Sequence, residues 1–216
     1  AYEVVINGLR RLEYRGYDSA GIVLDNNNSV FSVSKTKGKV DDLVAISQDL
    51  AGKSNVGMGH TRWATHGVPS DNNSHPHLSN NNKIALVHNG IIENYDTLKI
   101  MLTEKGFVFH SETDTEVLVN LIQYIMDVNK EMDFPTAVRY ALNEVFGAYA
   151  ITVMHDDFPG LLVVARLGSP LAIGLGNNEY FIASDASPFV EFTKEAVYLE
   201  EGHMATISLE NGVDIR

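Results

Sequence analysis

Hydrophobic residues recur at helical spacing in five stretches of the chain. Val5, Leu9 and Leu12 share one face, which predicts a helix over residues 3–14 at the very start. Shorter or similar patterns predict helices at 40–50, 94–105, 114–127 and 135–145. Thr113 is a candidate cap for the fourth of these, and the helices at 94–105 and 114–127 are expected to pack as a pair against a sheet.

Alternating or short apolar runs predict the strands. Residues 20–24 and 30–34 flank an Asn-rich tip and are typical of a hairpin. Further strands are expected at 56–60, 83–88, 148–155, 161–166, 171–176, 180–183, 197–199 and 204–209. Their short spacing favours antiparallel pairing, and the absence of a linker or repeat favours one layered domain over residues 1–216, with helices covering sheets.

Composition narrows the function classes. The 216 residues are 44% hydrophobic, enough for a sizeable core, and 16 Lys plus Arg against 28 Asp plus Glu give a net charge of −12. Such a charge disfavours binding to nucleic acid or to an anionic membrane. No apolar run reaches the roughly 20 residues that span a bilayer, so a cytoplasmic protein is expected.

The polar excursion at 61–82 begins with the densest group of candidate residues. Arg62 offers a fork for a carboxylate, Trp63 a movable apolar cover, and Thr65 and His66 polar contacts, a combination that suits a small amino-acid-like ligand. The alternative is a solvated loop in which Trp63 is a packing anchor. Composition alone does not separate the two.

Five histidines between residues 60 and 88 raise the question of a metal site. Their spacing matches no common zinc motif, HExxH does not occur, and the chain has no Cys. Loop histidines, or histidines that support other site residues, are the favoured interpretation.

Two short motifs each allow a structural and a chemical interpretation. Asn89-Gly90 is a strong turn signal, but the Asn amide and the Gly N–H could also act as paired oxyanion donors. Asp114 stands at an acidic helix start, and the two interpretations are stabilisation by the helix dipole and binding of a substrate ammonium. With Arg62 it would match both charges of an α-amino acid.

Five strings, in order and over nearly the whole chain, resemble the class II glutamine amidotransferases. They are Leu-Glu-Tyr-Arg-Gly-Tyr-Asp-Ser-Ala-Gly (12–21), the segments 59–67 and 88–94, the stretch 111–116, and the segment 168–176. The first two are similar to the amino-sugar branch of the family in particular. Branches that feed purine or asparagine synthesis share the layout but not these strings.

The resemblance implies an N-terminal nucleophile hydrolase fold: an α+β, four-layer αββα sandwich of two antiparallel sheets between helices. It also implies hydrolysis of glutamine to glutamate and ammonia by an N-terminal Cys, whose own α-amino group is the general base. That base is chemically apt, because the reference pKa of an α-amino group is about 7.7. No metal or organic cofactor is implied.

The family's functional residues carry over to matching positions of this chain. Asn89 and Gly90 would form the oxyanion hole. Arg62 would bind the glutamine carboxylate and Asp114 its ammonium. Thr65 and His66 would line the pocket, Trp63 would act as a lid, and Arg15 would help to organise the site.

The chain departs from the family at its nucleophile, because it contains no Cys. We expect that residue on a strand upstream of Ala1. We also expect an ammonia-accepting sugar isomerase domain elsewhere in the polypeptide, which makes glucosamine 6-phosphate from fructose 6-phosphate, and a homo-oligomeric full-length enzyme. The alternatives are the glutaminase domain of a purine-pathway enzyme and a glutamine-binding module without a nucleophile.

Overall fold

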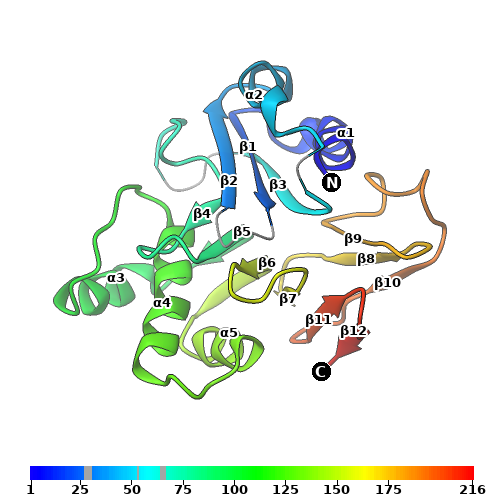
Figure 1. Cartoon of the computed structure of the whole chain (residues 1–216). Coiled ribbons are helices and arrows are strands. Elements are labelled where there is room, and N and C mark those ends of the chain that lie inside the picture. The colour runs from blue at the N-terminus through cyan, green and yellow to red at the C-terminus, as the bar shows by residue number, and fades with distance from the viewer. Residues whose placement is uncertain (27–30, 53, 64–66) are drawn as a thin grey trace.

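The computed structural model of the chain describes residues 1–26, 31–52, 54–63 and 67–216. Figure 1 shows two sheets that face each other, with α1 and α2 over one sheet and α3, α4 and α5 against the other. The helices are α1 (Tyr2–Leu12), α2 (Val40–Ser47), α3 (Tyr95–Glu104), α4 (Asp114–Val128) and α5 (Phe134–Asn143). The order of layers is therefore helix, sheet, sheet, helix, and the expected α+β αββα sandwich is confirmed.

The first sheet has the order β2-β1-β3 and is antiparallel throughout. It consists of β1 (Ser19–Asp25), β2 (Phe31–Lys37) and β3 (Val56–Arg62). Ile22 and Leu24 of β1 point toward the helices and are buried with Ile6 of α1 and Leu43 of α2. This burial explains why the amphipathic pattern of the first helix is so regular.

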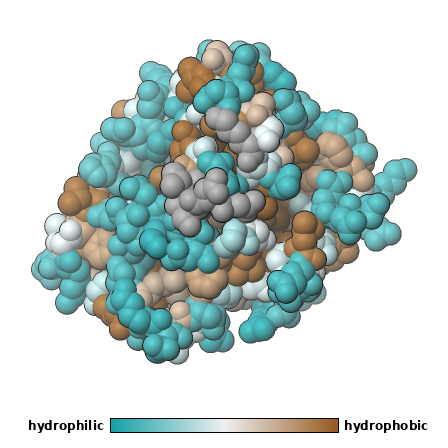
Figure 2. Space-filling model, in the orientation of Figure 1, coloured by the Kyte–Doolittle hydropathy of each residue, from teal (hydrophilic) through white to brown (hydrophobic). Residues whose placement is uncertain are grey.

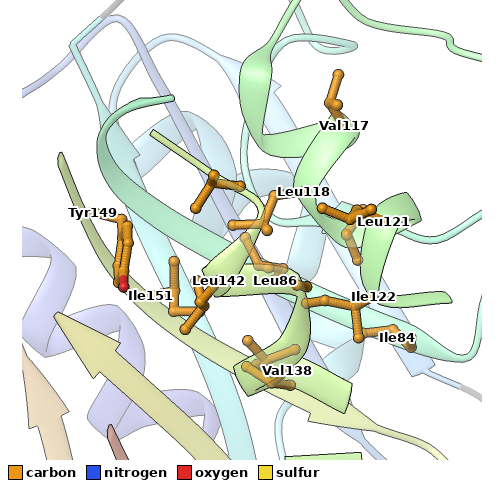
Figure 3. Close-up of a cluster of buried hydrophobic side chains, with 14 of the residues drawn as sticks. Ile84, Leu86, Val117, Leu118, Leu121, Ile122, Val138, Leu142, Tyr149 and Ile151 are labelled. Carbon is orange, nitrogen blue, oxygen red and sulfur yellow. The ribbon is translucent and has the colours of Figure 1, made fainter. Parts of the chain in front are cut away.

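The second sheet has the order β12-β11-β7-β6-β5-β4, also with antiparallel pairing. Its strands are β4 (His77–Leu78), β5 (Ile84–Ile92), β6 (Gly147–His155), β7 (Leu162–Leu167), β11 (Met204–Ser208) and β12 (Gly212–Ile215). Figure 3 shows Leu86 and Ile151 of this sheet pointing toward Leu118 of α4 and Val138 of α5. The outer face of the sheet and the predicted helix pair thus form the largest core.

A separate apolar cluster joins the inner faces of the two sheets. Val23 and Met58 come from the first sheet and Ala85 and Met154 from the second, and all four are buried. Because side chains alternate along a strand, the residues at two-residue intervals beyond this cluster also face the gap between the sheets.

A third, smaller sheet has the order β10-β8-β9. Its strands are β8 (Ala172–Leu175), β9 (Tyr180–Ala183) and β10 (Ala196–Tyr198). Phe181 and Phe189 are buried there and pack against Val4 of α1. The C-terminal third of the chain therefore returns to the helix at its start, as the position of the N-terminus near β9 in Figure 1 shows.

Most predicted elements are present, with shifted ends. The first helix gives way to a 3₁₀ turn at Glu13–Arg15, and Thr113 caps α4 by accepting a hydrogen bond from the Glu116 N–H at 3.3 Å. β4 and β12 were not predicted, because a two-residue strand and a Gly-Val-Asp-Ile segment carry too little apolar alternation. Two residues of the expected Asn-rich tip, Asn27 and Asn28, and the first residue of the predicted strand 30–34 lie outside the described residues.

The face of the molecule seen in Figure 2 is mostly hydrophilic, with apolar residues in separate small patches. Within the described ranges, no helix has both the length and the apolar character needed to cross a membrane.

Candidate active site

Asn89 and Gly90 lie inside a strand, so the hairpin-turn interpretation is wrong. In β5 they pair with Ala150 and Tyr149 of β6. Gly90 has a φ of +133°, and a Cβ there would overlap the carbonyl oxygen of Ala148. Only glycine fits this position without strain, which brings the Gly90 backbone close to the neighbouring strand.

The predicted site residues that the structure describes line one cavity of about 740 Å³. They are Arg15, Arg62, Trp63, Asn89, Gly90 and Asp114. Thr65 and His66, which were also predicted, lie outside the described residues. Residues from the 3₁₀ turn after α1, from the end of β3, from β5 and from α4, distant in sequence, thus converge on a single space.

Arg62 supplies the positive charge of the cavity. It is the last residue of β3, it is only 4% exposed, and its Nη2 lies 3.4 Å from the Gly67 carbonyl oxygen, which accepts the hydrogen bond. Burial lowers the pKa of Arg62, and nearby carboxylates, Asp114 first among them, oppose that effect. The guanidinium therefore stays charged in a low-dielectric setting, where it interacts strongly with an anionic ligand.

Asp114 supplies the negative charge from the N-terminus of α4. Its Oδ2 accepts a hydrogen bond from the Ile92 N–H at 2.8 Å and lies 3.9 Å from His88 Nδ1. The helix N-terminus favours a carboxylate at this position. Since Ile92 ends β5, this hydrogen bond also fixes α4 relative to the strand that carries Asn89 and Gly90.

Trp63 and Arg15 lie toward the surface. Trp63 is 59% exposed and makes an edge contact with Tyr17, with ring centroids 5.6 Å apart. The Arg15 Nη1 donates to Ser184 Oγ at 2.9 Å and to Asp185 Oδ2 at 3.1 Å. Arg15 therefore joins the end of the first helical segment to the segment after β9, which fits an organising role.

Four histidines form a cluster at the cavity that the sequence did not place in the site. His75, His77 and His88 are buried and His60 is partly exposed. All but His77 line the cavity. The rings of His60 and His75 stack with centroids 4.2 Å apart, and His77 meets His75 edge-on at 5.0 Å. Thr115 Oγ1 lies 3.0 Å from His88 Nδ1 and 3.3 Å from His75 Nε2. The dense histidine spacing was visible in the sequence, but only the fold shows that these rings contact each other.

Desolvation keeps His60, His75 and His77 of this cluster uncharged, because it lowers the pKa of each ring. It lowers the pKa of His60 to about 4, although a hydrogen bond with Asn89 opposes the shift. Burial also holds the pKa values of His75 and His77 well below the ordinary histidine value, and neighbouring positive groups lower them further. At neutral pH these rings are hydrogen-bonding groups rather than charges.

Two strand edges also face the cavity. In the described part of the chain, β3 is one of the two edge strands of the first sheet and β9 one of the two of the third. The lining includes residues of both edges and the apolar residues Val4, Val5 and Leu9 of α1. The cavity therefore combines polar strand ends with an apolar groove between two edges that have hydrogen-bonding capacity.

Comparison with known proteins gives consistent matches. A family model described as a glutamine amidotransferase domain matches residues 46–211. A glutamine–fructose-6-phosphate aminotransferase (isomerizing) from Bacteroides thetaiotaomicron is 54% identical over 96% of this chain, and one from Chlorobaculum tepidum is 50% identical over 98%. This chain spans only 34% of the length of each of these curated relatives.

The fold is similar to that of a solved amidotransferase structure. Glutamine phosphoribosylpyrophosphate amidotransferase from B. subtilis, in complex with ADP and GMP, matches with a TM-score of 0.83 at 28% identity. The match covers 99% of this chain and 46% of that chain.

The buried histidines predict a loss of stability in mild acid. An unfolded histidine takes up a proton near pH 6.5, whereas folded His60 does so only near 4, so the free energy of unfolding should fall as the pH drops through this interval. Each such histidine contributes a slope of about 1.4 kcal/mol per pH unit. Urea unfolding across the interval measures it.

The matched control for this prediction is His60→Gln, which cannot titrate. The slope of its unfolding free energy against pH should be smaller than that of the unsubstituted chain by about the contribution of one histidine. Equal slopes for the two proteins would mean that His60 is protonated as readily in the folded chain as in the unfolded one.

Proposed function

The chain belongs to the glutamine amidotransferase family, and from this premise we propose that it is the glutamine-hydrolysing domain of a glutamine–fructose-6-phosphate aminotransferase. Its four-layer fold is the one expected of an N-terminal nucleophile hydrolase. The ammonia released here would serve a sugar-converting domain in the rest of the polypeptide, since the relatives are about three times as long as this chain.

One observation carries the proposal: a single cavity holds a cation, an anion and a candidate oxyanion site. Arg62 matches the α-carboxylate of glutamine and Asp114 its α-ammonium. With both charged groups on the α-carbon held, the side-chain amide at the other end of glutamine reaches toward Asn89 and Gly90. The Asn89 Nδ2 and the Gly90 N–H then stabilise the negative oxygen that develops on the amide carbon.

We place the nucleophile on a strand that precedes Ala1 and enters the groove between β3 and β9. The support is the pair of strand edges and the apolar lining contributed by α1. In this arrangement a Cys thiol gives its proton to its own α-amino group and its sulfur bonds to the amide carbon. The C–N bond breaks as the α-ammonium returns this proton to the leaving nitrogen, which departs as ammonia, and water then hydrolyses the thioester to glutamate and the free thiol.

The purine-pathway alternative has weaker support. The B. subtilis phosphoribosylpyrophosphate enzyme shares the fold at 28% identity, whereas the aminotransferase relatives reach 50–54%. The Tyr-Arg-Gly-Tyr-Asp-Ser string at 14–19 also favours the amino-sugar branch.

The first test supplies the nucleophile. A chain extended upstream of Ala1 by a strand that begins with Cys should release ammonia from glutamine, and the 216-residue chain should not, because it has no thiol. The same extension with Ser in place of Cys is the matched control and should be nearly inactive. Ammonia release by the 216-residue chain at the rate of the Cys extension, or none from a folded Cys extension, would contradict the proposal.

Arg62→Ala tests the carboxylate contact in the extended chain. A charge-assisted hydrogen bond contributes about 1.5–3 kcal/mol, and this contact is present before and during the reaction, so kcat/KM should fall about ten- to a hundredfold, mainly through KM. Arg62→Lys keeps the positive charge but loses the forked guanidinium, so its kcat/KM should lie between those of Arg62→Ala and the unsubstituted chain. An unchanged KM for glutamine would remove Arg62 from the binding role.

Asn89→Ala tests the oxyanion donor. The developing oxyanion needs the donor more than the neutral amide oxygen does, so kcat should fall by roughly 10²–10³ while KM changes little. Asn89→Asp keeps the size of the side chain but replaces the donor with a carboxylate, and should be at least as impaired. Near-normal kcat per folded Asn89→Ala molecule, with the folded fraction measured by circular dichroism, would exclude the oxyanion role.

A further inference from the structure

A hydrogen bond between the two sheets connects the histidine cluster to the candidate oxyanion site. His60 of β3 and Asn89 of β5 face each other across the gap, and His60 Nε2 lies 2.8 Å from Asn89 Oδ1. The contact continues the apolar cluster of Met58 and Ala85, two and four residues earlier on the same strand faces. Along these two strands, the apolar packing between the sheets is thus followed by a polar contact.

The chemistry of the two groups decides which atom donates the hydrogen bond and which accepts it. The Oδ1 of an Asn amide only accepts hydrogen bonds, so the imidazole Nε2 must donate. Burial keeps His60 neutral at physiological pH, so the ring has one N–H to give, and the contact assigns it to Nε2. A neutral donor also adds no positive charge next to Arg62.

The orientation of an Asn amide determines whether it can act on an oxyanion. Its oxygen and its NH₂ group lie on opposite sides of the amide carbon, and only the NH₂ side can donate. When Oδ1 is held by His60, Nδ2 is directed away from His60 and toward the cavity that Asn89 lines. An unheld amide could rotate and present its oxygen to the oxyanion, which would oppose the reaction.

His60 is itself held from behind. Its ring stacks on His75 at an interplanar angle of 21°, and His75 Nδ1 accepts a hydrogen bond from the His88 N–H at 3.4 Å. The Thr115 hydroxyl, beside Asp114 on α4, contacts the other nitrogen of His75. A continuous set of contacts therefore runs from the start of α4 to the Asn89 amide.

We propose that His60 is a positioning residue of this site: its Nε2–H holds Asn89 Oδ1, so that Asn89 Nδ2 faces the cavity as an oxyanion donor. This inference rests on the proposed glutaminase function and adds to it a residue that acts on the reaction through Asn89. His60 also lines the cavity, so the test must separate a role through Asn89 from a direct contact with the substrate.

The kinetic test is a double-mutant cycle in the extended chain, with glutamine as substrate. His60→Leu, which removes the donor, should lower kcat about tenfold at nearly unchanged KM, a smaller loss than removal of the donor itself. His60→Gln, which retains an N–H, should recover most of this loss. In an Asn89→Ala background His60→Leu should change kcat less than twofold, because no amide remains to be oriented.

His77→Leu is the matched control. His77 is buried in the same cluster, but its Nε2 contacts Thr113 Oγ1 at 3.0 Å. Its substitution should lower the melting temperature and leave kcat per folded molecule unchanged. A full kcat loss from His60→Leu in the Asn89→Ala background, or no rescue by Gln, would overturn the positioning role.

A measurement without turnover separates this inference from the proposed function. Nitrogen-15 NMR of the histidine ring in the 216-residue chain identifies which nitrogen carries the proton, and we expect Nε2. A proton on Nδ1 would overturn the assigned orientation even if the extended chain is active. If the extended chain lacks glutaminase activity but Nε2 is protonated, the proposed function fails and the positioning contact stands.

Discussion

The packing of one sheet against the other is the constraint on which the site depends. Met58 and Ala85 are buried between the sheets, and this contact fixes how β3 and β5 lie over each other. Because strand side chains alternate, the same alignment places His60 opposite Asn89 and directs Arg62 into the gap. A shift of one residue in either strand would turn these side chains to the opposite face. The core therefore sets the chemistry at the strand ends.

The N-terminus of α4 is the second element on which the site depends. Thr113 caps the helix, Asp114 holds the end of β5 through the Ile92 N–H, and Thr115 contacts the histidine rings. Three consecutive residues thus have three different roles, which is possible because side chains at a helix start point in different directions. The simplest interpretation of the sequence is that the acidic residues of this segment stabilise the helix start. In the structure, Asp114 also holds the end of β5.

Much of the fold could be predicted from the sequence because it rests on local patterns. The apolar face of α4 and the apolar run of β1 are readable from a few neighbouring residues. Asn89-Gly90 shows the limit of such patterns: the local turn preference is overridden by nine paired residues between β5 and β6. The histidine cluster could not be predicted, since its members come from β3, the segment around β4, and β5. Likewise, nothing near Arg15 indicates its partners Ser184 and Asp185.

The contact between Arg15 and Asp185 has a consequence for how the site forms during folding. The two residues are 170 positions apart in the chain. Closing so long a loop carries an entropic cost that local contacts do not compensate, so such pairings form late. During synthesis, α1 and the first sheet can assemble while this side of the cavity is still absent. The Arg15 side of the cavity therefore belongs to the completely folded domain, and a nascent chain acquires it only after the segment beyond β9 has left the ribosome.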